Sequence, residues 1–252
     1  MPETLFDSLP VYLATCLIMV IAQAVYVLFG FGAGLIAVGT LALIFPQIQD
    51  VVVMLLLVNL PAELYVVITS RRHILWRSVL KIFAGIAAGI PLGTVILKYG
   101  EPTFILVLLG VFLIAVGSAF LFVPQQRAKP WPTWSEPGLG LISGMLTGLF
   151  GTGGPPLIIY YQLKGKTKAA FRGHLMAIFF LMTFVRLPSY AVGGLITLPR
   201  IWSSLALLPA VVLGAWLGNR IHLSLTEDTF RRLVSIVLML IGMVLLLRRF
   251  IS

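Results

Sequence analysis

Charged residues are scarce in this chain of 252 residues, since Asp, Glu, Lys and Arg together make up only 10% of it. A soluble domain of this size carries about a quarter charged residues, so the composition excludes an ordinary soluble protein. Hydrophobic residues make up 60%, and the mean hydropathy is +1.06. We therefore expect an all-α membrane protein that crosses the bilayer several times.

The residues that build disulfides and metal sites are also rare. Cys16 is the only cysteine, which excludes an intrachain disulfide framework. The three histidines are scattered and lack the spacing of a metal site. Because no histidine–carboxylate cluster is present either, we expect no catalytic residue, no metal and no cofactor.

Basic residues outnumber acidic ones and give a net charge of +10. They fall in short loops between apolar segments, so nucleic acid is not an expected partner. The first ten residues, "MPETLFDSLP", contain neither Lys nor Arg and lack the basic region of a signal peptide.

Long apolar segments dominate the rest of the chain. Two of them are interrupted: residues 10–45 at "FGFGAG" (29–34), and residues 138–163 at "FGTGGPP" (150–156). Six others have the roughly 20 apolar residues that a spanning helix needs. These six are 51–69, 79–97, 103–123, 174–191, 201–219 and 230–247.

The two interruptions belong to an internal repeat. "FGFGAG" matches "FGTGGP", aligning Gly30 with Gly151 and Gly32 with Gly153. Further matches follow in the same order: "GIPLG" (89–93) with "GAWLG" (214–218), "EPTF" (101–104) with "EDTF" (227–230), and "FLIAVG" (112–117) with "VLMLIG" (237–242). We predict one membrane domain with two repeats, 1–123 and 138–252, joined by a polar linker, 124–137. Repeats of this kind are common in secondary transporters.

The distribution of basic residues predicts how the repeats are oriented. Suppose that each interrupted segment enters the membrane and returns, that the other six cross, and that the linker is cytoplasmic. Thirteen Lys and Arg residues then lie on the cytoplasmic face and four on the outer face, as the positive-inside rule requires. Both termini are expected outside, and three crossings per repeat make the repeats inverted. The alternative has eight simple crossings.

The interrupted segments are candidates for an anion site, and we expect the two restarting helices, one from each repeat, to face each other near the midplane with the anion between them during alternating access. A helix that restarts in mid-membrane points free amides and the positive end of its dipole inward, and glycine lets an anion approach closely. The candidate substrate-binding residues here are Gly30, Gly32, Ala33, Gly34, Gly151, Thr152, Gly153, Gly154 and Pro155. The alternative is that these glycines serve only close helix packing.

Two ionisable residues fall inside predicted spans, where charge is costly and is often functional. Glu63 lies in "VNLPAEL" and Arg186 in "FVRLP", at near-equivalent places in the repeats. Arg186 can bind an anionic substrate while Glu63 carries a proton, or the two can form an ion pair. Arg186 can also extend to the outer interface. Asn59, one turn before Glu63, is a further candidate ligand.

Other polar residues are accessory candidates. Gln23 precedes the first interruption, and Tyr160 and Gln162 follow the second; each can donate to an anion or bond between helices. Arg172 and His174 begin a span at the predicted cytoplasmic edge. They can guard an inner mouth, although a solvated interfacial position is the expectation.

The motifs "GFGAG" and "GLFGTGGPP", in a chain of this length and hydropathy, resemble the sulfite exporter TauE/SafE family, also called the 4-toluene sulfonate uptake permeases. The resemblance covers the whole chain. It implies transport of sulfite, sulfonates, sulfoacetate or related carboxylates across the bacterial cytoplasmic membrane, in either direction. The expected partners are a small anion and the lipid bilayer. An anion channel, or less plausibly a membrane-embedded enzyme, is the alternative.

Overall fold

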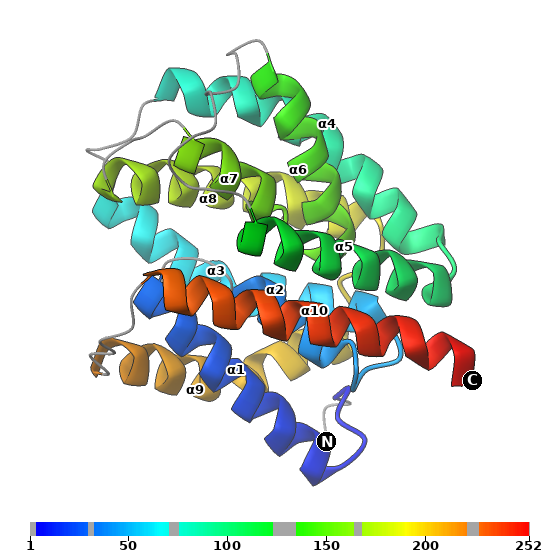
Figure 1. The fold of residues 1–252 in the computed structure, drawn as a ribbon. Helices are drawn as coiled ribbons and strands as arrows, with labels where there is room; N and C mark the ends of the chain where they lie inside the picture. Colours follow the sequence, from blue (N-terminus) through cyan, green and yellow to red (C-terminus); the bar gives the residue numbers. More distant parts are fainter. Residues whose placement is uncertain are drawn as a thin grey trace. The chain divides into compact units, whose positions relative to one another are not determined.

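The computed structural model describes residues 4–29, 33–70, 76–122, 135–163, 168–220 and 227–251. Every regular element in these ranges is a helix, which confirms the all-α prediction (Figure 1). The ten helices are α1 (Leu9–Phe29), α2 (Ala33–Leu41), α3 (Ile48–Ser70), α4 (Trp76–Tyr99), α5 (Pro102–Phe122), α6 (Glu136–Phe150), α7 (Gly154–Leu163), α8 (Lys168–Val192), α9 (Leu198–Arg220) and α10 (Glu227–Ile251).

Five of the six predicted spans lie within a single helix each, in α3, α4, α8, α9 and α10, and the sixth, 103–123, lies in α5 up to Phe122. Among the described residues, four helices are long and apolar enough to cross a membrane: α1, α4, α5 and α9. Many large apolar side chains on these helices are exposed, as expected where a helix faces lipid.

The helices form two compact units. Unit 1 comprises Met1–Val58, Gly100–Val123 and Thr197–Ser252, and unit 2 comprises Asn59–Tyr99 and Pro124–Ile196. Helix α3 begins in unit 1 and ends in unit 2. Both units draw helices from both halves of the sequence, so the compact units and the predicted repeats divide the chain differently.

In unit 2, glycines bring α4 and α6 into backbone contact. A Cβ on Gly89 would overlap the carbonyl oxygen of Leu141, and one on Gly93 would overlap that of Met145. The residue numbers rise together along both helices, so α4 and α6 run parallel. Small residues allow this close approach in membrane helices.

In unit 1, α9 packs on α1 in the same way. A Cβ on Gly214 would be pressed against the carbonyl oxygen of Val20, and one on Gly218 against that of Ala24. Gly214 and Gly218 are the counterparts of Gly89 and Gly93 in the matched motifs. The sequence match between "GIPLG" and "GAWLG" therefore corresponds to a repeated helix contact.

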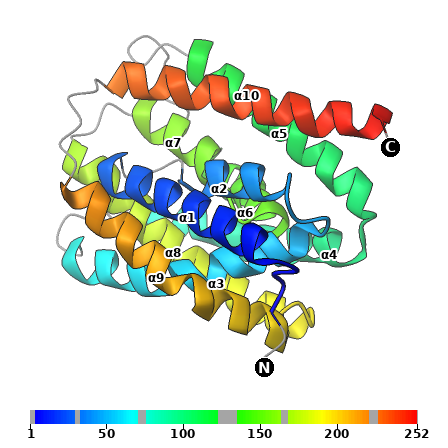
Figure 2. The same cartoon turned by 90° about the horizontal axis from the view of Figure 1, so that it is seen from below.

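Helices α5 and α10, also in unit 1, lie side by side and run antiparallel (Figure 2). Gly117 approaches Ser235 and Met239, while its counterpart Gly242 approaches Gly110 and Ile114. When "FLIAVG" is aligned with "VLMLIG", Gly110 corresponds to Ser235 and Ile114 to Met239. Each of the two glycines approaches equivalent positions on the opposite helix. The contact between α5 and α10 is therefore reciprocal between counterpart residues.

Candidate anion site at the break between α6 and α7

The predicted break in the second interrupted segment is confirmed. Helix α6 ends at Phe150, and Gly151 caps it in the left-handed conformation with φ of 73°. The Gly151 N–H donates to the Thr147 carbonyl oxygen over 2.8 Å. Helix α7 restarts at Gly154, with Pro155 and Pro156 in its first turn. Proline is tolerated there because first-turn amides have no partner within the helix.

The chain reverses direction at this break. A Cβ on Gly153 would overlap the Ser143 carbonyl and the Thr147 hydroxyl, so α7 begins against the C-terminal half of α6. Farther along α7, the Tyr160 hydroxyl donates to Oε1 of Glu136, the first residue of α6, over 2.6 Å. Helices α6 and α7 thus form an antiparallel hairpin. A single straight crossing through 138–163, as the eight-crossing alternative requires, is wrong.

Arg186 on α8 lies against the tip of this hairpin. Its Nη1 donates to the Gly151 carbonyl oxygen over 3.4 Å, and its guanidinium lies 5.0 Å from the centre of the Tyr190 ring. The Tyr190 hydroxyl in turn donates to the Gly148 carbonyl oxygen over 2.9 Å. Arg186 is 6% exposed, so its side chain turns inward and does not extend to the surface. The structure therefore brings two predicted features, the break and Arg186, together.

A row of buried polar residues runs along α6 toward the break. Glu136, Ser143 and Thr147 are spaced by seven and four residues, which places them on one face of the helix. Thr147 Oγ1 donates to the Ser143 carbonyl oxygen over 2.7 Å and also approaches Sδ of Met182 on α8. We call these three residues the α6 polar row; it faces α7 at both ends of the hairpin.

The expectation of a solvated His174 is wrong. His174 is completely buried, and its ring centre lies 5.4 Å from that of Tyr161 on α7. The reason is that α8 begins at Lys168, nearly two turns earlier, so His174 lies inside the packed part of that helix. Tyr160 is also buried, and its hydroxyl bonds to Glu136 between helices, one of the two alternatives for this residue.

Sequence reasoning did not single out Glu136 or Arg200 as buried residues, and the structure buries both. Glu136 is 2% exposed within α6. In unit 1, Arg200 on α9 forms a buried ion pair with Asp50 on α3, with Nε and Nη2 at 2.8 and 2.7 Å from Oδ1. The available signal for Asp50 was its position just before an apolar segment, where a carboxylate favours a helix start.

The remaining candidates are placed only in part. Helix α1 ends at Phe29 and α2 begins at Ala33, so a helix also restarts at the first predicted break. Gln23 is buried beside Gly214, Asn59 is half-buried on α3, and Gly34 lies within α2. The following lie outside the described residues: Gly30 and Gly32, and the side chains of Ala33, Glu63, Gln162 and Arg172.

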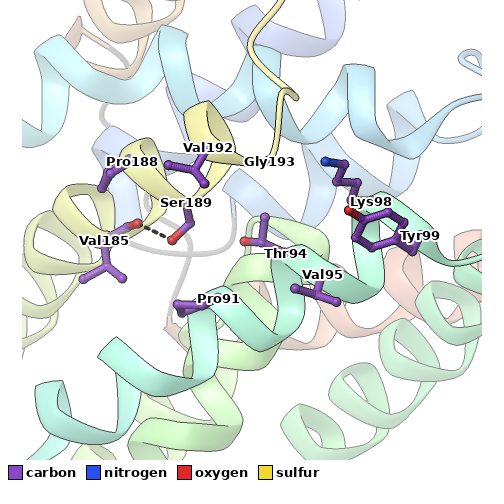
Figure 3. Close-up of a pocket in the computed structure, with 10 residues that line it drawn as sticks. All are labelled: Pro91, Thr94, Val95, Lys98, Tyr99, Val185, Pro188, Ser189, Val192 and Gly193. Carbon is purple, nitrogen blue, oxygen red and sulfur yellow. Dashed lines mark hydrogen bonds between the residues drawn. The ribbon is translucent and has the colours of Figure 1, made fainter.

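An apolar cavity of about 480 Å³ lies between α4 and α8 (Figure 3). The hydroxyls of Thr94 and Ser189, which line it, donate to carbonyl oxygens of their own helices. Lys98 and Tyr99 lie at one end of the cavity. Neither the break nor Arg186 lines it, so this cavity is separate from the candidate anion site. No group of His, Cys, Asp and Glu within the described ranges could hold a metal ion.

Comparison with known proteins identifies the family. Residues 15–245 match the family described as Sulfite exporter TauE/SafE. The chain is 28% identical over 222 residues to a "Probable sulfite/organosulfonate exporter TauE" of Cupriavidus necator, covering 86% of this chain and 87% of that protein. It is 26% identical over 192 residues to a "Probable inner membrane transporter protein TsaS" of Comamonas testosteroni, covering 75% and 80%. No solved structure matches.

The match spans nearly the whole chain, and it agrees with an all-helical fold that contains long apolar helices. It also agrees with the resemblance that the two glycine-rich motifs indicate. The chain therefore belongs to the sulfite exporter TauE/SafE family, a family of membrane transporters and not of enzymes.

Proposed function

We propose that this protein is a secondary transporter of small sulfur-containing or organic anions, with the anion bound at the tip of the α6–α7 hairpin. The observation that carries the proposal is the contact of Arg186 with Gly151, because it places a guanidinium where the broken helix turns. The names of the two relatives, an exporter of sulfite and organosulfonates and an inner membrane transporter, support the substrate class and the location in the bacterial inner membrane.

The chemistry of the tip suits an anion. The start of α7 carries the positive end of the helix dipole, which attracts negative charge. Pro155 and Pro156 have no N–H, so the donors near the tip are the amides of Thr152, Gly153 and Gly154. Arg186 adds a forked donor that fits an oxyanion. Because backbone donors are few here, side chains carry a larger share of the recognition.

We also propose that the two repeats are inverted and that transport proceeds by alternating access around the hairpin tips. The reciprocal contacts of α5 and α10 support inversion, since counterparts that pack antiparallel have opposite directions in the membrane. The glycine contacts of α4 with α6 and of α9 with α1 occur at matched positions, which supports a helix arrangement that is common to the two repeats. In such folds, broken helices commonly hold the substrate near the midplane.

The helix directions support the proposed topology, with the linker 124–137 cytoplasmic and both termini outside. That topology requires α4 parallel to α6, α9 parallel to α1, and α5 antiparallel to α10. All three relationships are observed within the units. In this arrangement the α6–α7 hairpin enters from the cytoplasmic side and returns to it. Glu63 remains our candidate for a proton carrier or for a partner of Arg186.

A thermal-shift screen of the purified full chain tests the proposed function. The probes are sulfite, methanesulfonate, sulfoacetate and acetate, with chloride as the reference salt. A ligand that binds only the folded state raises the melting temperature by mass action. We expect a selective shift with at least one sulfur-containing anion. Equal, salt-like shifts with all of the anions would overturn the proposal.

Flux in proteoliposomes separates a carrier from an anion channel. A carrier exchanges external labelled anion against a trapped unlabelled pool, so uptake saturates and is accelerated by the trapped anion. We expect this counterflow for any anion that shifts the melting temperature. Non-saturating flux without counterflow, together with high conductance, would replace the carrier with a channel.

A further inference from the structure

Ser143 differs from the other buried serine and threonine residues of the described helices. Eight Ser and Thr residues are buried there, and seven of them donate to the carbonyl oxygen four residues earlier. Those seven are Thr15, Thr94, Thr147, Thr183, Ser203, Ser204 and Ser235. Ser143 is 0% exposed, and its Oγ has no hydrogen-bond partner.

This difference calls for an explanation because buried polar groups are almost always hydrogen-bonded. A serine within a helix has a ready acceptor one turn back, which the other seven residues use. Leaving a buried hydroxyl without a partner is unfavourable, and a functional role such as binding a ligand is one explanation for such a group. The hydroxyl of Ser143 is thus a donor held in the dry interior of unit 2.

The position of Ser143 indicates which ligand it serves. Ser143 is the middle residue of the α6 polar row, and its backbone carbonyl lies against Gly153, the residue just before α7 begins. Gly151, on the other side of the turn, contacts Arg186. Three elements therefore carry donors on residues of the hairpin or next to it: Ser143 on α6, the Gly153 and Gly154 amides at the start of α7, and Arg186 on α8.

We propose that the Ser143 hydroxyl donates a hydrogen bond to the transported anion and selects head groups with three oxygens over those with two. This inference rests on the proposed anion site. Sulfite and sulfonates present three oxygens in a pyramid, whereas a carboxylate presents two in a plane. The α7 amides and Arg186 occupy two oxygens of either head group, and Ser143 is the donor for the third.

Titration calorimetry with methanesulfonate and acetate tests the selection, because the two probes share a methyl group and differ in the head group. The proteins are the purified wild type, Ser143→Ala, and the control Ser235→Ala, whose hydroxyl is equally buried but bonds to the Arg231 carbonyl. We expect Ser143→Ala to weaken methanesulfonate binding by about tenfold or more. Its acetate affinity, and both affinities of Ser235→Ala, should stay near wild type.

Thermal unfolding without ligand shows whether the role of Ser143 is merely structural. Because the Ser143 hydroxyl has no partner, its removal should leave the melting temperature unchanged or raise it. Ser235→Ala removes a satisfied bond and should lower the melting temperature slightly. A methanesulfonate-binding defect in a Ser143→Ala protein of undiminished stability would support the inference.

Three results would overturn it. Equal losses for methanesulfonate and acetate would remove the selection, and unchanged affinity for both would remove Ser143 from the site. A lowered melting temperature of Ser143→Ala would show that the hydroxyl is bonded within the protein. If wild type binds none of the anions in the earlier screen, the proposed function fails and this inference fails with it; if wild type binds and Ser143→Ala binds equally, only this inference fails.

Discussion

The pairs α4–α6 and α9–α1 share one scaffold but carry different chemistry. Gly89 meets Leu141 and Gly214 meets Val20, at matched places in the two halves. The residues of the α6 polar row are not repeated as the same residue types in the first half. With the offset of 121 that aligns Gly30 with Gly151, the counterparts of Glu136, Ser143 and Thr147 are Thr15, Ala22 and Tyr26. The repeated glycines therefore mark the shared scaffold, and the residues that differ include those of the anion site that we propose.

The two buried arginines differ in a parallel way. Arg200 in unit 1 binds the carboxylate of Asp50, whereas Arg186 in unit 2 contacts a backbone carbonyl at the hairpin tip and an aromatic ring. The first arrangement joins α9 to α3 and is structural. The second places a cation where the broken helix turns, which suits a ligand. Substitutions should therefore separate stability in unit 1 from anion binding in unit 2.

Breaking the Asp50–Arg200 pair should have the largest effect on stability. Asp50→Asn or Arg200→Gln leaves one buried charge without its partner, which costs about 3–5 kcal/mol. The double substitution removes both charges and should recover part of this loss. Thermal unfolding in detergent measures the effect. Single variants with the wild-type melting temperature would show that the pair contributes nothing.

Substituting the matched scaffold glycines should have the next largest effect. Gly89→Val and Gly214→Val each force a side chain into the backbone of the facing helix, and overpacking of this kind costs about 1–3 kcal/mol or more. Gly138→Val is the control, since nothing lies within 4 Å of a Cβ at that position. We expect the two test variants to lose similar stability. If either variant keeps the wild-type stability, the two glycine contacts are not equivalent.

Substituting the two glycines that have a positive φ among the described residues should have the smallest effect on stability and should affect anion binding differently. Gly151 has φ of 73° and Gly194 has φ of 69°, and replacing either by Ala costs about 1–2 kcal/mol. Gly151→Ala should also weaken anion binding, because it shifts the carbonyl that contacts Arg186. Gly194→Ala should leave anion affinity unchanged. If Gly151→Ala and Gly194→Ala bind the anion with equal affinity, the turn at Gly151 is not part of the anion site.

Features with a strong local signal could be predicted from the sequence. The six uninterrupted spans follow from apolar length, and the break before Gly154 follows from glycine and proline in an apolar segment. The paired positions of Gly89 and Gly214 follow from the repeat. Each of these depends on residues close together in the chain, or on a comparison of one half with the other.

Features that depend on long-range packing could not be predicted. Asp50 and Arg200 are 150 residues apart, and nothing local indicates that they meet. Glu136 follows a polar linker, so its burial depends on how α6 packs against α7. The sequence does not indicate that the Ser143 hydroxyl lacks a hydrogen bond. The carbonyl oxygen four residues earlier is available to Ser143 as it is to the other buried serine and threonine residues.

The measurement that tests the central claim most directly is the Kd for methanesulfonate of wild type, Arg186→Gln and Arg220→Gln. Arg220 is a matched control, since its guanidinium lies 4.9 Å from the Trp216 ring as that of Arg186 lies 5.0 Å from Tyr190, but it is exposed at the end of α9. With the anion at the hairpin tip, Arg186→Gln raises the Kd by about tenfold or more, and Arg220→Gln leaves it unchanged. A wild-type Kd for a folded Arg186→Gln protein would contradict the account.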